Sequence, residues 1–191
     1  EKMNRFIIFK YINLTGDLKN KIMIKYIFLQ KNPASHYVYI DMHVDNISSD
    51  TIQMQLASWR PGRYELGNFA KNVKRVDVFN EKGEALKYNK VTKDLWEINC
   101  KGSTSIKVTY SYYSAELNAG ACYADDSQIY MNPVHCCMYV VGRQNEKHQV
   151  ELQIPDNYSI ACSLEKEGRV LTASNYDELA ESPFIASKNL Q

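Results

Sequence analysis

The chain has 191 residues, of which 45% are hydrophobic and 24% are charged, and this composition excludes a disordered or collagen-like chain. The 23 basic and 22 acidic residues leave a formal net charge of +1, so the overall charge predicts neither a nucleic-acid nor an anionic-membrane partner. Tyrosine is abundant, with 14 residues, and together with many Val, Ile and Thr residues it favours strands over helices.

The first 20 residues precede the first clear strand pattern, and we interpret them as an extension of uncertain role. Their apolar run is interrupted at Lys10 and Asn13, before it reaches the length of a signal peptide. A second apolar run, 22–29, is broken by Lys25. Both runs are shorter than the roughly 20 apolar residues that a membrane-spanning helix needs, so we expect no membrane partner.

From residue 21 onward, apolar and polar residues alternate in short runs separated by turn residues, a pattern typical of strands with one buried face. Ile52, Met54 and Leu56, for example, fall on one face of such a run. No stretch shows a long helical period. Strands are expected at 22–30, 36–44, 51–58, 74–80, 86–89, 94–99, 105–114, 128–140, 149–154 and 160–163.

The predicted fold is therefore mainly β: residues 21–191 form a single β-rich domain, a sandwich of paired antiparallel sheets with one short C-terminal helix. This helix begins near Ser174 and Asn175, whose side chains can cap the first free amide groups. Glu178, three residues after Asn175, is placed for a capping box, and the helix ends before Pro183.

The five cysteines are an odd number at irregular spacing, without a C-x-x-C pair. This pattern predicts free, mostly buried thiols rather than a disulfide framework, and it mildly favours a cytoplasmic location. The cysteines are Cys100, Cys122, Cys136, Cys137 and Cys162.

The sequence contains no H-E-x-x-H zinc motif, no G-x-S-x-G elbow, no P-loop and no G-x-G-x-x-G loop. His135 and Cys137 are predicted to share a strand face, and with Cys122 or His148 they could form a mixed metal site. Their spacing matches no familiar ligand set, so we expect packed thiols and imidazoles and no metal. Neighbouring residues on a strand face apart, so His135 is not expected to activate Cys136 for catalysis.

The segment 59–64, with the sequence WRPGRY, predicts a type II turn, because Pro61 fixes φ and Gly62 accepts a positive φ. Its two arginines could hold a carboxylate. The preferred interpretation is a structural turn that ends a strand, with Trp59 and Tyr64 packing inward.

The polar segment 117–133 is predicted to be a surface loop between two strands. Its adjacent carboxylates, Asp125 and Asp126, could bind a cation or a substrate ammonium group, although neighbouring aspartates are more often simply solvated.

Several short motifs occur in order along the chain: SHY at 35–37, LASWRPGRY at 56–64, NFAKNV at 68–73, KDLW at 93–96, VTYSYYSA at 108–115, YMN at 130–132 and YDELAESP at 176–183. As an ordered set they resemble the N-terminal domain of the glycyl-aminopeptidase family of zinc metallopeptidases. The resemblance covers about residues 23–183. Two details depart from it: Ala57 and Ser58 replace an expected Leu-Pro, and Glu181 replaces an expected aspartate.

The resemblance implies a non-catalytic domain that packs on a thermolysin-like catalytic domain beyond Gln191 and helps to shape the cleft around the substrate's amino terminus. It implies zinc for that catalytic domain only, and no cofactor in this chain. The partners would be the catalytic domain and, indirectly, a peptide substrate. In related aminopeptidases, an acidic or amide side chain of this domain helps to hold the substrate ammonium group. The candidates here are Asp125, Asp126, Gln128 and Asn132.

An alternative is a self-standing peptide- or glycan-binding β-sandwich module that uses exposed tyrosines on one sheet face, although alternating tyrosines more often line a core. An independent hydrolase is the least supported alternative. The tyrosines of this alternative are Tyr37, Tyr39, Tyr110, Tyr112 and Tyr113.

Overall fold

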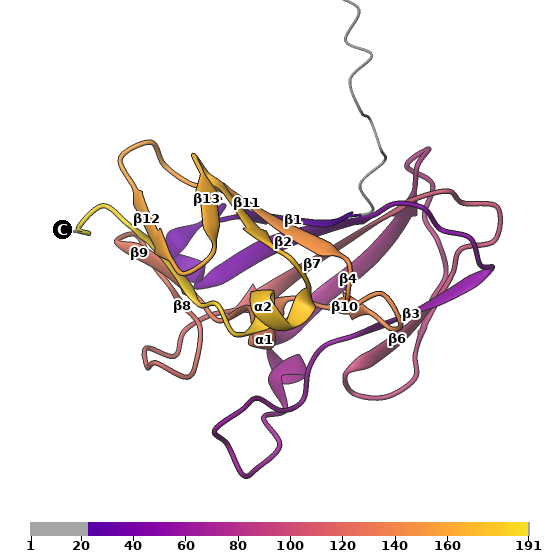
Figure 1. Cartoon of the computed structure of the whole chain (residues 1–191), viewed down its shortest axis with the longest axis horizontal. Helices are drawn as coiled ribbons and strands as arrows, with labels where there is room; N and C mark the ends of the chain where they lie inside the picture. The colour runs from indigo at the N-terminus through magenta and orange to yellow at the C-terminus, as the bar shows by residue number, and fades with distance from the viewer. Residues whose placement is uncertain (1–22, 191) are drawn as a thin grey trace, which may run out of the picture.

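The computed structural model describes residues 23–190, and these fold mainly as β-strands (Figure 1). Residues 1–20 lie outside the described residues, so their interpretation as an extension stays a prediction. The strands are β1 (Met23–Leu29), β2 (Tyr37–Val44), β3 (Thr51–Gln55), β4 (Val73–Asn80), β5 (Tyr88–Lys90), β6 (Leu95–Asn99), β7 (Ile106–Tyr113), β8 (Tyr123–Ala124), β9 (Gln128–Met131), β10 (Tyr139–Val140), β11 (Lys147–Gln153), β12 (Ser159–Cys162), β13 (Glu165–Glu167), β14 (Val170–Ala173) and β15 (Phe184–Ser187).

These strands form three sheets. The largest has seven strands in the order β13-β14-β11-β1-β2-β7-β4, and the two smaller sheets have the orders β10-β3-β6-β5 and β12-β15-β9-β8. The two smaller sheets lie toward opposite ends of the large sheet, with the α-helices between them (Figure 1). The prediction of a mainly β fold is confirmed.

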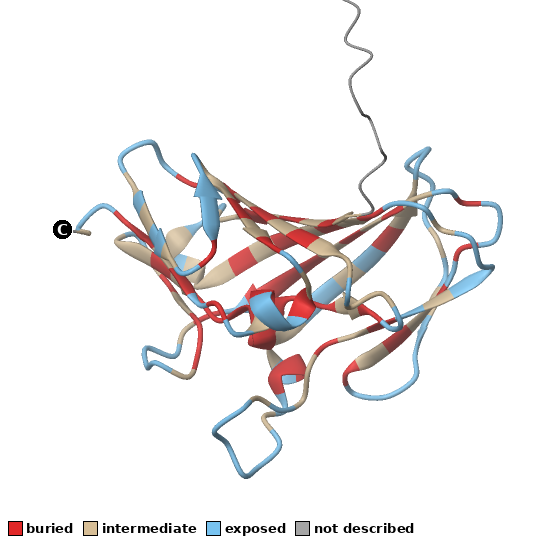
Figure 2. Cartoon of the chain, in the orientation of Figure 1, coloured by how far each residue is buried: buried red, intermediate tan, exposed pale blue. Residues whose placement is uncertain are grey.

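One face of the large sheet is buried in the core. In β1, Ile24, Tyr26 and Phe28 are buried, whereas the residues between them are partly exposed. Phe28 packs edge to face on Phe184 of β15, with ring centroids 5.4 Å apart, so the large sheet and one smaller sheet share a core. Figure 2 shows buried residues on all three sheets.

The prediction of antiparallel sheets holds for all but one strand pair of residues 23–190. β1 and β11 pair in parallel, with Met23 opposite Lys147 and Leu29 opposite Gln153. Between these two strands the chain builds β2, β4 and β7 of the large sheet and most of the two smaller sheets, so a long connection separates the parallel pair, as such a pair requires.

The predicted strand at 128–140 is wrong in its middle. The structure has β9, then a short helix α1 (Pro133–Cys136), then β10. Pro133 explains the break, because proline has no N–H for a sheet and its fixed φ suits the first turn of a helix. Residues 23–190 therefore contain two short α-helices instead of the one predicted. The sequence patterns also missed four short strands: β8, β13, β14 and β15.

The predicted C-terminal helix is confirmed as α2 (Tyr176–Ala180). The Asn175 side chain accepts a hydrogen bond from the Glu178 backbone N–H at 2.8 Å, and the Glu178 carboxylate accepts one from the Ser174 N–H at 2.6 Å. These two bonds satisfy amide groups that the helix leaves free. Neither α-helix of residues 23–190 has the length and apolar character needed to cross a bilayer.

Three buried tyrosines hold the segment that follows α1. The hydroxyl of Tyr110 donates to the Cys136 carbonyl at 2.7 Å, that of Tyr176 to the Cys137 carbonyl at 3.0 Å, and that of Tyr26 to the Met138 carbonyl at 2.7 Å. Consecutive carbonyls of an irregular segment are thus satisfied in the interior, where unpaired polar groups are costly. The bonds come from β7, α2 and β1, so they join the large sheet to the helices.

We expect Tyr110→Phe to lower the free energy of unfolding by about 1–3 kcal/mol, because it leaves the buried Cys136 carbonyl without its donor. The matched control is Tyr113→Phe on the same strand, whose exposed side chain should change stability by less than about 0.5 kcal/mol. Urea denaturation of both variants measures the difference, and equal stabilities would contradict the expectation.

The tyrosines of the alternative binding module do not form one exposed face. Tyr110 and Tyr112 are buried in the core, whereas Tyr113 is exposed. Tyr37 and Tyr39 are partly exposed, and the ammonium groups of nearby lysines lie over both rings. These five tyrosines therefore do not provide the exposed aromatic surface that a peptide- or glycan-binding module would need.

Candidate functional site

The WRPGRY segment forms a tight turn after β3. Gly62 has a φ of 81°, which only glycine adopts readily, and Pro61 precedes it. The Arg63 N–H donates to the Arg60 carbonyl at 3.4 Å across the turn. The indole N–H of Trp59 donates to the Arg63 carbonyl at 2.6 Å and closes the turn from its other side.

The turn belongs to a loop, residues 58–67, that projects from the molecule at the lower edge of Figure 1. The Gly67 N–H donates to the Ser58 carbonyl at 2.6 Å, so the two ends of the loop are joined. The prediction that Trp59 and Tyr64 pack inward is wrong: Trp59 is 49% exposed and Tyr64 is fully exposed. The reason is that the loop is closed by its own hydrogen bonds and not by burial of its aromatic residues.

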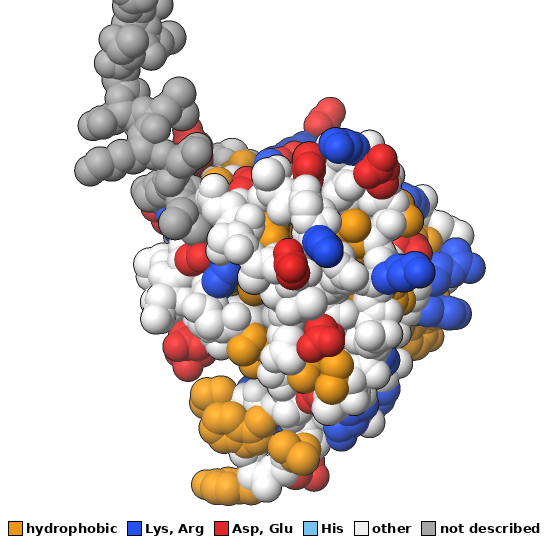
Figure 3. Space-filling view, turned by 90° about the vertical axis from the view of Figure 1, so that its right-hand side faces the viewer, with side chains coloured by type: hydrophobic (Ala, Val, Ile, Leu, Met, Phe, Trp, Pro, Cys, Tyr) orange, Lys and Arg blue, Asp and Glu red, His pale blue; other side chains and the backbone are white. Residues whose placement is uncertain are grey.

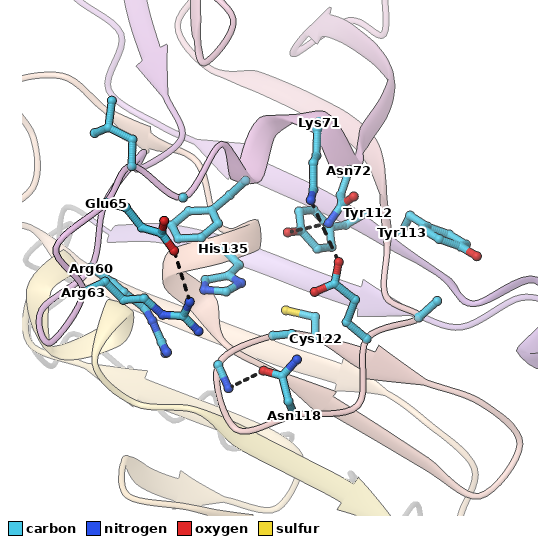
Figure 4. A pocket seen from close by; sticks show the side chains of 17 residues that line it. Arg60, Arg63, Glu65, Lys71, Asn72, Tyr112, Tyr113, Asn118, Cys122 and His135 are labelled. Carbon is cyan, nitrogen blue, oxygen red and sulfur yellow. Dashed lines mark hydrogen bonds and ion pairs between the residues drawn. The ribbon is translucent and has the colours of Figure 1, made fainter.

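A cavity of about 280 Å³ lies beside this loop (Figure 4). Its walls are the loop itself, the 3-10 helix Phe69–Asn72, the end of β7, the segment 115–122 and His135 of α1. Elements that are distant in sequence therefore meet at this cavity.

His135 forms the deep wall of the cavity. Its ring stacks on Phe69, with centroids 3.8 Å apart and planes 16° from parallel. Burial, followed by the nearby Arg60 and Arg63, lowers the pKa of His135 from 6.5 to about 4, so the imidazole is neutral at pH 7. Its Nε2 atom is buried and has no hydrogen-bond partner among residues 23–190.

Charged side chains surround the mouth of the cavity. Arg63 lies 3.8 Å from the Glu65 carboxylate, and Lys71 lies 4.0 Å from the Glu116 carboxylate, both at exposed positions where ion pairs are weak. Arg60 has no carboxylate of the described chain within ion-pair distance. The excess charge around the cavity is therefore positive.

A second, more open hollow of about 540 Å³ lies on the other side of the turn. Arg60 lines both hollows, whereas Trp59 and Pro61 line only the second and Arg63 lines only the first. The second hollow is called the groove below. Its walls include Trp59, Pro61, Asn132, Val134, Tyr139, Tyr176, Asp177, Glu181 and Pro183.

The Asp125 side chain is hydrogen-bonded within the β8–β9 turn. Its carboxylate accepts hydrogen bonds from the Ser127 N–H at 2.8 Å, the Gln128 N–H at 3.0 Å and the Tyr123 hydroxyl at 3.0 Å. Partial burial acts to raise the pKa of Asp125, but these bonds outweigh it and the pKa is lowered. Asp126 is exposed next to it. None of these residues lines the cavity or the groove.

Asn132 lies at the other end of β9, so the structure does not bring the four candidate residues together. Its side-chain amide donates to the carbonyls of Ala121 and Ala119, which fixes the loop before β8. No hydrogen bond to its Oδ1 atom forms within residues 23–190, and this buried residue is among those that line the groove. Asn132 is thus the candidate that faces a hollow.

The thiols and imidazoles considered as a mixed metal site do not assemble into one. Among residues 23–190, no three His, Cys, Asp or Glu side chains are grouped so that they can hold a metal ion. The ring of His148 packs against the rings of Tyr26 and Tyr176 and does not join such a group. Burial raises the pKa of the Cys122 and Cys136 thiols, so both are poor nucleophiles.

Comparison with known proteins now adds to this geometry. The profile described as Peptidase M61 N-terminal domain matches residues 25–188. The chain belongs to the Peptidase M61 N-terminal domain family. The resemblance found in the sequence is thereby confirmed at the level of this peptidase family, while the glycyl preference that it implied stays a prediction.

A solved structure shares the fold of this M61 N-terminal domain. An aminopeptidase N family protein from Idiomarina loihiensis has a TM-score of 0.78 and 20% sequence identity, over 86% of this chain and 29% of that chain. An M1 zinc metallopeptidase from Deinococcus radiodurans has a TM-score of 0.48 and 10% identity, over 86% of this chain and 41% of that chain. The M61 N-terminal domain thus spans less than half the length of either protein. A search of curated proteins gives no match.

Phe69 lines the cavity of this M61 domain, and its sequence position did not predict that role. It lies in the NFAKNV motif, but no periodic pattern marks a residue in a 3-10 helix as the stacking partner of His135. The motif order was the only signal available.

Proposed function

We propose that this chain is the non-catalytic N-terminal domain of a zinc metallo-aminopeptidase that prefers glycyl substrates. In this proposal the domain packs on the catalytic domain and shapes the end of the cleft that receives the substrate's amino terminus. The family membership supports the peptidase context. Zinc would bind to the catalytic domain, because residues 23–190 offer no ligand group for it.

The observation that carries the proposal is the apolar surface on and beside the 58–67 loop. Trp59, Tyr64 and Leu66 are exposed on this loop, and Leu117 is 66% exposed on the segment that borders the same cavity. Figure 3 shows hydrophobic side chains gathered at the lower end of the molecule, the end from which the loop projects. Monomeric proteins rarely expose such a patch, and a packing interface accounts for it.

The first test is the sequence encoded after Gln191. An H-E-x-x-H motif followed by a downstream glutamate would supply the zinc-binding domain that the proposal requires. A continuation without such a motif would contradict the proposal.

The second test concerns packing in the longer polypeptide. Replacing both Tyr64 and Leu66 by serine should remove apolar contact with the catalytic domain, so calorimetry should resolve two thermal transitions where the parent shows one. The control is Val91→Ser, at an exposed apolar position outside this loop. A single unchanged transition in the double variant would contradict docking through the loop.

We expect Asn132 to be the residue that receives the substrate ammonium group. In the longer enzyme, Asn132→Ala should raise KM for a glycyl substrate about tenfold, the effect of losing one charge-assisted hydrogen bond. Alanine substitutions of Asp125, Asp126 and Gln128 are the matched controls and should leave KM unchanged, since these residues line neither hollow. An unchanged KM for Asn132→Ala together with a raised KM for the other three variants would instead place the ammonium subsite at the β8–β9 turn.

A further inference from the structure

Two arginine side chains converge beside the cavity. A Cβ atom added to Gly120 would collide with the Nη2 atoms of both Arg60 and Arg63, so both guanidinium groups lie against the same point of the backbone. Figure 4 shows the two side chains next to each other, on the side of the cavity where His135 lies. Two cations held this close repel each other unless an anion lies between them.

We propose that this cavity is a binding site for a carboxylate group, which is held by Arg60 and Arg63 and receives a further hydrogen bond from Nε2 of His135. The proposal concerns residues of this chain alone and does not depend on the proposed function.

The chemistry of the three residues fits a carboxylate. Guanidinium groups present planar pairs of N–H donors that match the two oxygens of a carboxylate. The only carboxylate of the described chain that lies within ion-pair distance of either arginine is the exposed Glu65, 3.8 Å from Arg63. Arg60 therefore keeps its donors available.

His135 supplies the second, independent observation. It is 5% exposed, it lines the cavity, and its Nε2 atom has no partner in the described chain. A buried polar atom without a hydrogen-bond partner destabilises the fold, and a ligand that forms a hydrogen bond with it removes this penalty. A neutral imidazole with its proton on Nε2 can donate to a carboxylate oxygen, and a bound anion would in turn favour protonation of the ring.

The cavity size limits the ligand. A volume of about 280 Å³ holds a small molecule or one amino-acid side chain, since a water molecule takes about 30 Å³ of the liquid. The stacked rings of Phe69 and His135 give one wall a flat, partly apolar surface. Two sources of carboxylate fit this description: a free acid or chain terminus, and an Asp or Glu side chain of a neighbouring domain.

The experiment is an NMR titration of the 191-residue chain with N-acetylglycine at constant ionic strength. We expect saturable shifts of the His135 ring and Gly120 amide signals, and a rise of the His135 pKa in the presence of the probe. N-acetylglycinamide is the neutral control of the same shape and should cause neither change. Equal responses to the two compounds, or no response to either, would overturn the proposal.

Three variants test the residue assignment. Arg60→Met and Arg63→Met should each weaken binding of N-acetylglycine at least about tenfold, since each removes charged hydrogen bonds. Gly120→Ala should also weaken binding while both charges remain, because its Cβ displaces the flexible ends of the two arginines. Arg75→Met, in a depression with Tyr37 and Tyr39, is the control and should bind as the parent does.

A second probe separates the two sources. N-acetylglutamic acid α-methylamide carries its only carboxylate on a side chain, as a neighbouring domain would present it. Tighter binding of this compound than of N-acetylglycine assigns the site to a protein side chain, and the reverse order assigns it to a free acid or chain terminus. If the parent chain binds neither compound, the proposal is wrong.

Discussion

Replacing Phe28 by alanine is expected to lower the free energy of unfolding by about 3–5 kcal/mol. Phe28 is 2% exposed and packs on Phe184 with ring planes 82° apart, so its removal opens a cavity between the large sheet and the β12-β15-β9-β8 sheet. The loss combines the transfer free energy of the ring with the cost of that cavity and of the aromatic pair. Because these sheets share one core, the variant should still unfold in a single transition.

Urea denaturation followed by circular dichroism and by tyrosine fluorescence measures this change. The matched control is Tyr64→Ala, an aromatic residue that is fully exposed, and its effect should stay below about 0.5 kcal/mol. A loss smaller than about 1 kcal/mol for Phe28→Ala would mean that the contact between the two sheets contributes little. Separate transitions for the two probes would mean that the sheets unfold independently.

The sequence predicted the strands with one buried face because their alternation is a local property. Val150 and Leu152 alternate with the polar Gln149, Glu151 and Gln153 in the printed sequence, and in β11 the two apolar residues are buried while the polar ones are partly or fully exposed. The parallel partner of β1 was not predictable in this way, because pairing with β11 depends on the path of the chain between the two strands.

The site was less predictable than the sheets, because it is built from loops. The turn at Pro61 and Gly62 follows from local chemistry, but the outward direction of Trp59 follows from hydrogen bonds that close the loop. His135 was assigned to a strand because Pro133 was not treated as a strand breaker, although proline is excluded from central strands. Its neighbours Phe69 and Arg60 are distant in sequence, and no pattern within one sequence joins them.

Acidification from pH 7 to about pH 4.5 is expected to remove about 2.4 kcal/mol of stability through His135. Burial, followed by Arg60 and Arg63, lowers the pKa of His135 from 6.5 to about 4. At pH values between these two pKa values, His135 is protonated in the unfolded chain and neutral in the folded chain. Stability therefore rises with pH across this window and is lost as the pH falls through it. The pKa of His148 is also lowered, mainly by burial, so this residue adds to the loss in the same direction.

Comparison with His135→Gln isolates the contribution of this residue. The free energy of unfolding of both proteins is measured by urea denaturation at several pH values between 7 and 4.5. Carboxylates with a lowered pKa, such as Asp125, begin to affect stability near the lower end of this range, and because both proteins carry them, their contribution cancels in the comparison. The variant should be less sensitive to pH by about 2.4 kcal/mol over the whole window, because glutamine does not titrate. An unchanged pH dependence would mean that the His135 ring is protonated equally well in the folded chain.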